Sequence, residues 1–293
     1  MLTSDSHSGF DRGFTYGGIY EVRYQMELKG DTVLLVDSGD AIQGAPLGKN
    51  TKGEYIIKFM NEMGYEVAVP GEHEFHYGVD RFLELRDHAK YEYICCNFLK
   101  DGQPVMKPYI IREVLGKQIA FVGVTTPKTL AFIPPEYFKN EAGDFVYSFM
   151  QEDGTGMAMA DAVQDAINKA KGAGADYVVV MGHLGNDESC APWNYQTLLS
   201  RIQGCDVYLD GYTHDYAVEE AEDASGKKIP RINAGANLHG IGWVRISGEN
   251  GKITTGVYTW QDKRNPMELF AIENPMTKKV RAVQKLPEAK HQG

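Results

Sequence analysis

Short apolar runs rich in β-branched residues alternate along the chain with segments whose apolar residues have helical spacing. The run 176–181 (DYVVVM) is typical of a buried strand, and the segment 53–63 is typical of a helix that Gly64 would end. The strands are predicted at 31–36, 66–69, 93–96, 118–124, 176–181, 206–209, 229–234, 241–247 and 253–260, and the helices at 53–63, 79–89, 158–171 and 195–202. Repeated strand–helix–strand units with a β-rich close predict an α/β fold with layers built around sheets.

The composition is that of an ordinary globular protein with an acidic surface. The 293 residues suffice for one large domain, and the formal net charge is −10. Such a charge repels polyanions, so a nucleic-acid polymer or an anionic membrane is not an expected partner. The chain also lacks an apolar run of about 18 residues, the length that a membrane-spanning helix needs.

The four cysteines, Cys95, Cys96, Cys190 and Cys205, form no CxxC pair, so a zinc knuckle or a thioredoxin-like motif is not predicted. Cys95 and Cys96 end an apolar run. Buried free thiols are therefore favoured over a disulfide.

Acids and imidazoles follow the predicted strands in Gly-containing loops. These residues are Asp5 and His7, Asp40, Glu72 and His73, His183, and His214. Taken singly, each has a simpler explanation, because Asp-x-His strings occur in surface turns, aspartates cap helices and turns, and buried histidines often only form hydrogen bonds. Five such sites at successive strand ends favour one metal site at the edge of the sheets, where α/β proteins place their sites.

The motifs, in this order, resemble those of the calcineurin-like metallophosphoesterases. The stretches 37–44 (DSGDAIQG), 71–78 (GEHEFHYG) and 210–214 (DGYTH) are similar to the catalytic domain of the 5′-nucleotidase / 2′,3′-cyclic-nucleotide 2′-phosphodiesterase family. The resemblance runs from Leu2 to about Trp260. It implies a four-layer α/β/β/α sandwich with two divalent metals between the sheets.

The resemblance also implies roles for individual residues. The implied metal ligands are Asp5, His7, Asp40, Glu72, His183 and His214, with Asp40 as the bridge between two ions. His73 would be the catalytic imidazole that stabilises the transferring phosphoryl group, and His76, at the position of its partner, is the second predicted catalytic residue. A metal-activated water would attack phosphorus in line. The cofactor would be one or two ions of manganese, zinc, iron or cobalt.

Three positions depart from the family pattern. The family has Gly-Asn-His-Glu-Phe-Asp where this chain has Glu72 and His76, and it has Gly-His-x-His where this chain has Tyr212. Glu72 can still ligate through an oxygen. Tyr212 can ligate only as a phenolate, so packing or a hydrogen bond is its favoured role. His76 cannot orient His73 as a carboxylate would, and the alternative for His76 is an exposed turn residue.

The expected function is hydrolysis of nucleotide phosphomonoesters or cyclic nucleotides with reduced activity, so the expected partner is a small nucleotide or phosphate ester. The alternative is a weak or inactive relative that binds one metal or a phosphorylated ligand. A third possibility is an adhesion module that merely inherited the fold. The strand-end charges argue against the third possibility, because they would be buried without compensation.

The domain prediction divides the chain at residue 265. Residues 1–265 would be the catalytic domain, and residues 266–293 would resemble the start of an interdomain helix, with a basic helix at 275–286 leading away from the core. The second, substrate-binding domain of the family is not expected in this chain. The resemblance implies an exported or cell-surface protein, and the start at Met1-Leu2-Thr3 implies that a signal peptide is absent or trimmed.

Overall fold

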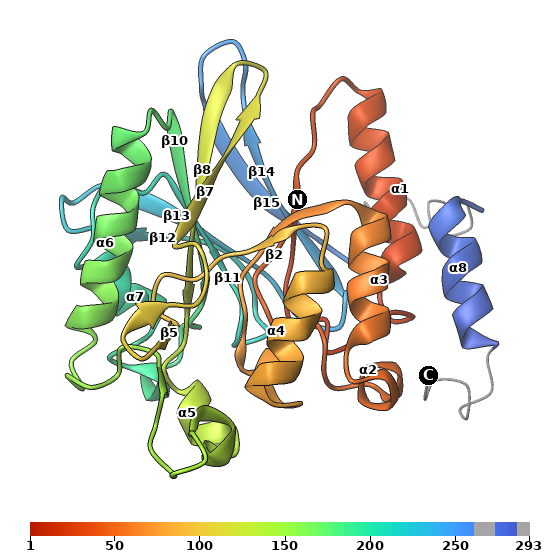
Figure 1. Ribbon diagram of the computed structural model, residues 1–293. Coiled ribbons are helices and arrows are strands. Elements are labelled where there is room, and N and C mark those ends of the chain that lie inside the picture. Colours follow the sequence, from red (N-terminus) through yellow and green to blue (C-terminus); the bar gives the residue numbers. More distant parts are fainter. Residues whose placement is uncertain (261–272, 286–293) are drawn as a thin grey trace.

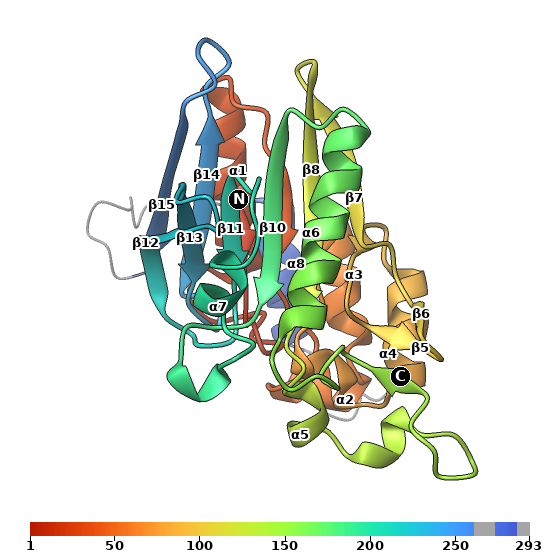
Figure 2. The ribbon, with the colours of Figure 1, turned by 90° about the vertical axis from the view of Figure 1, so that its left-hand side faces the viewer.

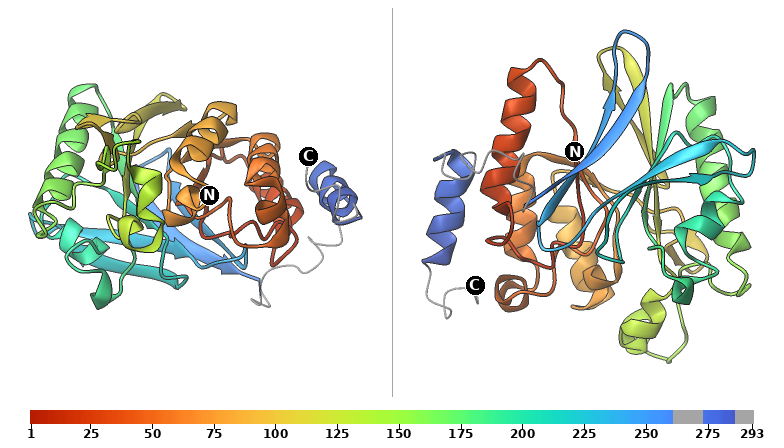
Figure 3. Two further views of the ribbon diagram at one scale, coloured as in Figure 1. Left: turned by 60° about the horizontal axis from the view of Figure 1, so that its bottom comes forward. Right: turned by 180° about the vertical axis from the view of Figure 1, so that it is seen from behind.

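Two six-stranded sheets pack face to face, and helices cover both outer faces (Figures 1 and 2). The structure is a computed structural model that describes residues 1–260 and 273–285. Seen from behind, α1, α3 and α8 lie on one side of the sheets and α6 lies on the other (Figure 3). The predicted four-layer α/β/β/α sandwich is confirmed. The predicted boundary at residue 265 lies outside the described residues.

The strands of both sheets are mostly short. The first sheet has the order β15 (Ile253–Thr259), β14 (Gly240–Ile246), β1 (Leu2–Thr3), β2 (Leu35–Asp37), β3 (Tyr65–Ala68) and β4 (Glu92–Tyr93). The second has the order β12 (Tyr216–Glu222), β13 (Lys228–Ala234), β11 (Val207–Asp210), β10 (Tyr177–His183), β8 (Lys117–Thr125) and β7 (Tyr109–Val114). A small third sheet contains β6 (Gln103–Pro104), β5 (Leu99–Lys100) and β9 (Tyr147–Ser148).

The helices follow the strands along the chain. The α-helices are α1 (Thr15–Leu28), α2 (Pro46–Thr51), α3 (Glu54–Met63), α4 (Val79–His88), α5 (Thr129–Phe132), α6 (Met157–Gly172), α7 (Tyr195–Leu199) and α8 (Pro275–Gln284). Three 3₁₀ turns are η1 (Glu72–Phe75), η2 (Pro135–Phe138) and η3 (Glu188–Cys190). Helix α3 ends at Gly64 with a φ of 69°, as the sequence predicts, because glycine tolerates this left-handed conformation.

Strand β10 shows how the layers are held together. Val179 and Met181 point into the apolar layer between the two sheets, together with residues such as Val36 of β2. Val178 and Val180 point the other way and pack with the buried residues of α6. A strand that is covered on both faces reads as a continuous apolar run, which explains the sequence DYVVVM.

Parallel pairing sends the polar loops to one end of the sandwich. Strands β1, β2, β3 and β4 are parallel neighbours in the first sheet, and β8, β10, β11 and β13 are parallel neighbours in the second. The carboxyl ends of β1, β2, β3, β10 and β11 lie at one end of the sandwich. These are the strand ends that carry the predicted acids and imidazoles.

Several elements differ from the prediction. The sequence gives no sign of α1, β7 or β12, and the predicted helix 195–202 is only Tyr195–Leu199. The strand predicted at 93–96 is present as β4 (Glu92–Tyr93), followed by a single bridge from Ile94 to Lys107.

The sequence predicts a helix at 275–286 that leads away from the core, but helix α8 packs against the core instead. Met276 and Val280, one turn apart, are buried in the same apolar cluster as Ile19 of α1. The Asn274 side chain donates to the Gly17 carbonyl at 2.9 Å. A Cβ on Gly17 would lie 2.5 Å from Thr277, so the glycine permits the close approach of α1 and α8.

Membrane-spanning helices and the state of the cysteines were checked over the residues that the structure describes. No helix there is both long enough and apolar enough to cross a membrane. All four cysteines are buried free thiols, the state that the sequence favours for Cys95 and Cys96.

Candidate metal and catalytic centre

Six of the predicted site residues meet where the strands of both sheets end. Asp5, His7 and His214 form one group whose potential ligand atoms lie within 4.8 Å of one another, and Asp5, Asp40 and His183 form a second such group. A third group joins His73 to His7 and Asp40. The groups overlap, so the strand ends build one continuous cluster from loops that are far apart in the sequence.

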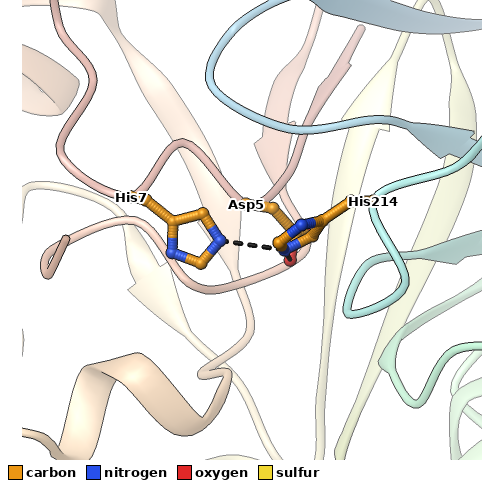
Figure 4. Close-up of side chains that lie close together, drawn as sticks. All are labelled: Asp5, His7 and His214. Carbon is orange, nitrogen blue, oxygen red and sulfur yellow. Dashed lines mark hydrogen bonds and ion pairs between the residues drawn. The ribbon is translucent and has the colours of Figure 1, made fainter. Parts of the chain in front are cut away.

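In the first group, two imidazole nitrogens point toward each other. The Nε2 atoms of His7 and His214 lie 2.9 Å apart, and His214 Nε2 lies 3.4 Å from Asp5 Oδ1 (Figure 4). Asp5 is fully buried, and its carboxylate accepts the Tyr212 backbone N–H at 3.0 Å. Two imidazoles and one carboxylate are donors that suit a zinc, iron or manganese ion.

The second group surrounds the ring of His183. His183 Nδ1 donates to the Ser38 carbonyl at 2.6 Å, which leaves Nε2 directed toward the cluster. His183 Nε2 lies 3.3 Å from Asp40 Oδ2 and 3.2 Å from Glu72 Oε2. A backbone carbonyl on one ring nitrogen with the other nitrogen free is the usual arrangement of a metal-binding histidine.

Two buried atoms in and beside this second group form no hydrogen bond in the described part of the chain. His183 Nε2 and Glu72 Oε2 are both buried, and both are unsatisfied. Unsatisfied buried polar atoms are costly, so a native structure calls for an explanation of each one. A divalent cation between the imidazole and the carboxylates would satisfy both atoms. The residues present therefore fit a metal ion.

The pKa values of His183 and Asp40 also favour a bound cation in this cluster. Burial lowers the pKa of His183, but the neighbouring Asp40 and Asp5 carboxylates outweigh burial and raise it well above the ordinary value. Burial, assisted by the charge of Glu72, raises the pKa of Asp40. Protons are thus retained where buried negative charge converges. A metal cation would supply the same compensating positive charge.

His73 lies at the edge of the cluster on the turn η1. Its backbone N–H donates to Asp40 Oδ1 at 2.7 Å, and its Nε2 lies 3.8 Å from Asp40 Oδ2. Its Nδ1 forms a short hydrogen bond with the side-chain oxygen of Gln43. Burial and the neighbouring His7 lower the pKa of His73 to about 3, so the ring is neutral at pH 7. The sequence does not reveal the partner Gln43.

The side chains at the three positions that depart from the family pattern have different surroundings. Glu72 faces the cluster, as described above. The Tyr212 ring packs edge to face against the His183 ring, with centroids 5.7 Å apart, and burial raises the pKa of its phenol. A neutral phenol fits the favoured packing role rather than a phenolate ligand. His76 is half-buried and stacks on His73, with ring centroids 4.5 Å apart and an interplanar angle of 24°.

Glu74 holds the two central loops together. Its fully buried carboxylate accepts the backbone N–H groups of Asp40 and Ala41 at 2.8 Å and that of Gly71 at 2.7 Å. It thereby ties the loop after β2 to the loop after β3. The sequence could have indicated the bond from Gly71 to Glu74, because a glutamate three residues into a helical turn often accepts the N–H that precedes the turn.

We expect Glu74→Gln to destabilise the fold by about 2–3 kcal/mol, because an amide NH₂ would replace one acceptor oxygen of a buried carboxylate. Thermal unfolding of the purified variant measures the effect. Glu84→Gln is the matched control, since Glu84 forms a surface ion pair with Arg81 and is 54% exposed. Equal unfolding midpoints for the two variants would contradict this role for Glu74.

Left-handed backbone conformations are concentrated in the cluster. Asp5, His7, Asp40, Tyr212 and His214 have φ values of 50°, 45°, 60°, 80° and 58°. Such conformations are uncommon outside glycine and gather at functional sites, where the surrounding structure compensates for the strain. The fold and the cluster together match the class of domain that the sequence resemblance implies.

Comparisons with known proteins agree with that class. The chain is 30% identical over 230 residues to a 2′,3′-cyclic-nucleotide 2′-phosphodiesterase/3′-nucleotidase of Salmonella typhimurium (71% of this chain, 33% of that protein). It is 27% identical over 212 residues to a snake venom 5′-nucleotidase of Crotalus adamanteus (69% and 32%). The crystal structure of the calcineurin-like phosphoesterase YfkN from Bacillus subtilis matches with a TM-score of 0.71 at 19% identity, covering 100% of this chain and 98% of that one. No family profile matches.

The predicted resemblance is confirmed. The chain is a homologue of proteins named 5′-nucleotidase and 2′,3′-cyclic-nucleotide phosphodiesterase/3′-nucleotidase, and it shares the fold of the calcineurin-like phosphoesterases. Its named homologues are hydrolases. The chain spans about a third of the length of these curated relatives.

Proposed function

We propose that residues 1–265 form the catalytic domain of a metal-dependent phosphoesterase that hydrolyses nucleotide phosphomonoesters or cyclic nucleotides. The observation that carries the proposal is the convergence of buried carboxylates and imidazoles from both sheets, with unsatisfied atoms on His183 and Glu72. The names of the homologues supply the substrate class. An exported or cell-surface location is part of the same proposal, because a venom protein is secreted.

We propose that the ligands form two overlapping metal positions. Asp5, His7 and His214 would hold the first ion with Asp40, and His183 and Glu72 would share Asp40 at the second. Bound divalent ions supply an activated water and neutralise charge on the phosphoryl oxygens. The acidic surface makes a small phosphate ester a better partner than a polymer.

His73 is the residue of this chain best placed to act on the substrate. Its ring projects toward the cluster with Nε2 3.8 Å from Asp40 Oδ2, and its backbone N–H is fixed by the same carboxylate. From this position, a protonated Nε2 would donate to a phosphoryl oxygen or to the leaving oxygen. A carboxylate would stabilise that protonated ring, but this chain has His76 where the family has an aspartate. We therefore propose reduced turnover.

A second candidate is a weak or inactive relative that holds one metal or a phosphorylated ligand. The observation that favours it is the set of contacts made by Tyr212 and His76, two of the three unusual positions. The Tyr212 ring packs edge to face against His183, and His76 is stacked on His73 without a hydrogen bond between the rings in the described structure. The second metal position then has one imidazole, that of His183.

Metal removal and return distinguish the two candidates. We expect protein treated with a chelator to lose hydrolysis of an aryl phosphate, a 5′-nucleotide and a 2′,3′-cyclic nucleotide, and to regain it with manganese, zinc, cobalt or iron. Elemental analysis should then show two ions per chain. One ion per chain without turnover supports the second candidate. Absence of turnover with every metal and every ester would overturn the proposed function.

A further inference from the structure

The partner of His73 is a neutral amide. Gln43 presents its side-chain oxygen to His73 Nδ1 in a short hydrogen bond. An amide oxygen can only accept, so Nδ1 carries the proton in this contact. In the neutral ring, the lone pair is then on Nε2, which faces Asp40 and the rest of the cluster.

The loop that carries Gln43 is anchored on both sides. The preceding residue, Ile42, donates its backbone N–H to Glu74 at 3.3 Å, and Ala45 donates its own to the His7 carbonyl at 2.7 Å. The loop is therefore held between the segments of Glu74 and His7, and the Gln43 side chain reaches His73 from it.

His76 occupies the sequence position of the family's orienting carboxylate but does not perform its task. Its ring lies nearly parallel to that of His73, at a centroid distance of 4.5 Å. Stacked rings direct their nitrogens along parallel planes, so His76 covers a face of His73 and leaves Nδ1 to Gln43. A hydrogen bond in the ring plane fixes rotation and tautomer, whereas a stacking contact fixes neither.

We infer that Gln43 is the positioning residue for the imidazole of His73, in the role that a carboxylate fills in the family. The inference rests on the proposed phosphoesterase function. The amide holds the ring in the orientation that directs Nε2 into the cluster. Because it is neutral, it stabilises a cationic His73 less than a carboxylate would, which is consistent with the reduced turnover proposed above.

The test compares Gln43→Met with Gln43→Glu. Methionine has a similar length and cannot accept this hydrogen bond, while glutamate supplies a carboxylate at the same position. We expect Gln43→Met to lower kcat by about 10–100-fold with little change in KM, as for other residues that orient a metal-site group. Glutamate should restore kcat to the wild-type value or above. Gln25→Met, which removes a glutamine that bonds Glu21 on α1, is the control.

A second readout does not depend on turnover. In ¹⁵N-histidine spectra of the zinc-loaded protein, the signal that disappears in His73→Gln should show a protonated Nδ1 in the wild type and lose that state in Gln43→Met. An unchanged tautomer together with unchanged kcat would overturn the inference, as would a wild-type ring protonated at Nε2 alone. If the wild type hydrolyses nothing yet shows the Gln43-dependent tautomer, the positioning stands and the proposed function fails.

Discussion

Replacing Asp40 by asparagine is expected to reduce metal-dependent hydrolysis by more than about 100-fold while the chain remains folded. Asp40 is buried in the centre of the cluster, with one oxygen accepting the His73 N–H at 2.7 Å and the other 3.3 Å from His183 Nε2. Loss of a residue that merely orients a ligand costs about 10–100-fold, so the loss of the shared ligand should exceed that range. Phosphate release and metal content are the two measurements.

Asparagine suits the backbone at this position. Asp40 has a φ of 60°, and asparagine is among the residues that tolerate the left-handed region best. The amide keeps one oxygen for the His73 N–H but removes the negative charge that two cations would share. Bound metal should therefore fall from two ions toward one, with little change in the thermal unfolding midpoint of the metal-free protein.

Asp37→Asn provides the matched control. Asp37 ends β2, only three residues before Asp40, and is also buried. It accepts hydrogen bonds from the Thr3 hydroxyl and the Gly39 N–H, and burial raises its pKa to about 8. It is therefore mostly protonated at pH 7, where asparagine resembles it. Equal loss of activity in both variants would show that buried polarity near β2, rather than metal binding by Asp40, supports activity.

The site depends on the packing of two sheets. Asp5 and Asp40 follow strands of the first sheet, whereas His183 ends a strand of the second. Direct bonds cross between them, from His183 to the Ser38 carbonyl and from the Tyr212 N–H to Asp5. Gly211 makes this contact possible, because a Cβ there would lie 2.6 Å from His183 Nδ1. A shift between the sheets would separate the ligands.

The sequence reveals the parts of the fold that have strong local patterns. Strand β10 and helix α3 are recognisable because burial on two faces, or on one helical face, leaves a regular apolar signal. Strand β12 lacks that signal. It is an edge strand with exposed Glu219, Glu220 and Glu222, and its pairing with β13 rather than its own side chains makes it a strand.

The candidate site also has features that the sequence predicts and features that it does not. Asp40, Glu72, His73, His183 and His214 were identifiable because each follows a predicted strand, whereas Asp5 and His7 were identified by their motif. The hydrogen bond from Gln43 to His73 was not, since it joins two loops that meet only after β2 and β3 pair. The contact of the Tyr212 ring with His183 likewise depends on how the loop after β11 packs beside the end of β10. Residue type predicted the chemistry, and tertiary packing decided the partners.

A buried arginine supports the loop that carries His214. The Arg231 side chain is fully buried and bonds Asp210 at 2.9 Å, Asp215 at 2.8 Å and Glu219 at 2.7 Å. Its guanidinium also lies 4.5 Å from the centroid of the Tyr195 ring. Asp210 and Asp215 flank the segment that contains Tyr212 and His214, so this one cation fixes both ends of a loop of the site.

Arg231→Met is expected to destabilise the protein by about 3–5 kcal/mol, because Asp210 would remain buried without its partner. For a domain of this size, the loss corresponds to a fall in the unfolding midpoint of roughly 5–15 °C. Differential scanning calorimetry of the metal-free protein measures it directly. Metal binding at His214 should weaken as well, since Asp215 loses its ion pair.

Two further variants identify the cause. Lys169→Met breaks an ion pair with Asp165 in which both side chains are about 60% exposed, and it should leave the midpoint unchanged because solvent screens such pairs. Arg231→Met combined with Asp210→Asn should recover part of the loss, because the second change removes the uncompensated buried charge. A double variant as unstable as the sum of its single changes would indicate that lost packing, and not the buried carboxylate, makes Arg231 necessary.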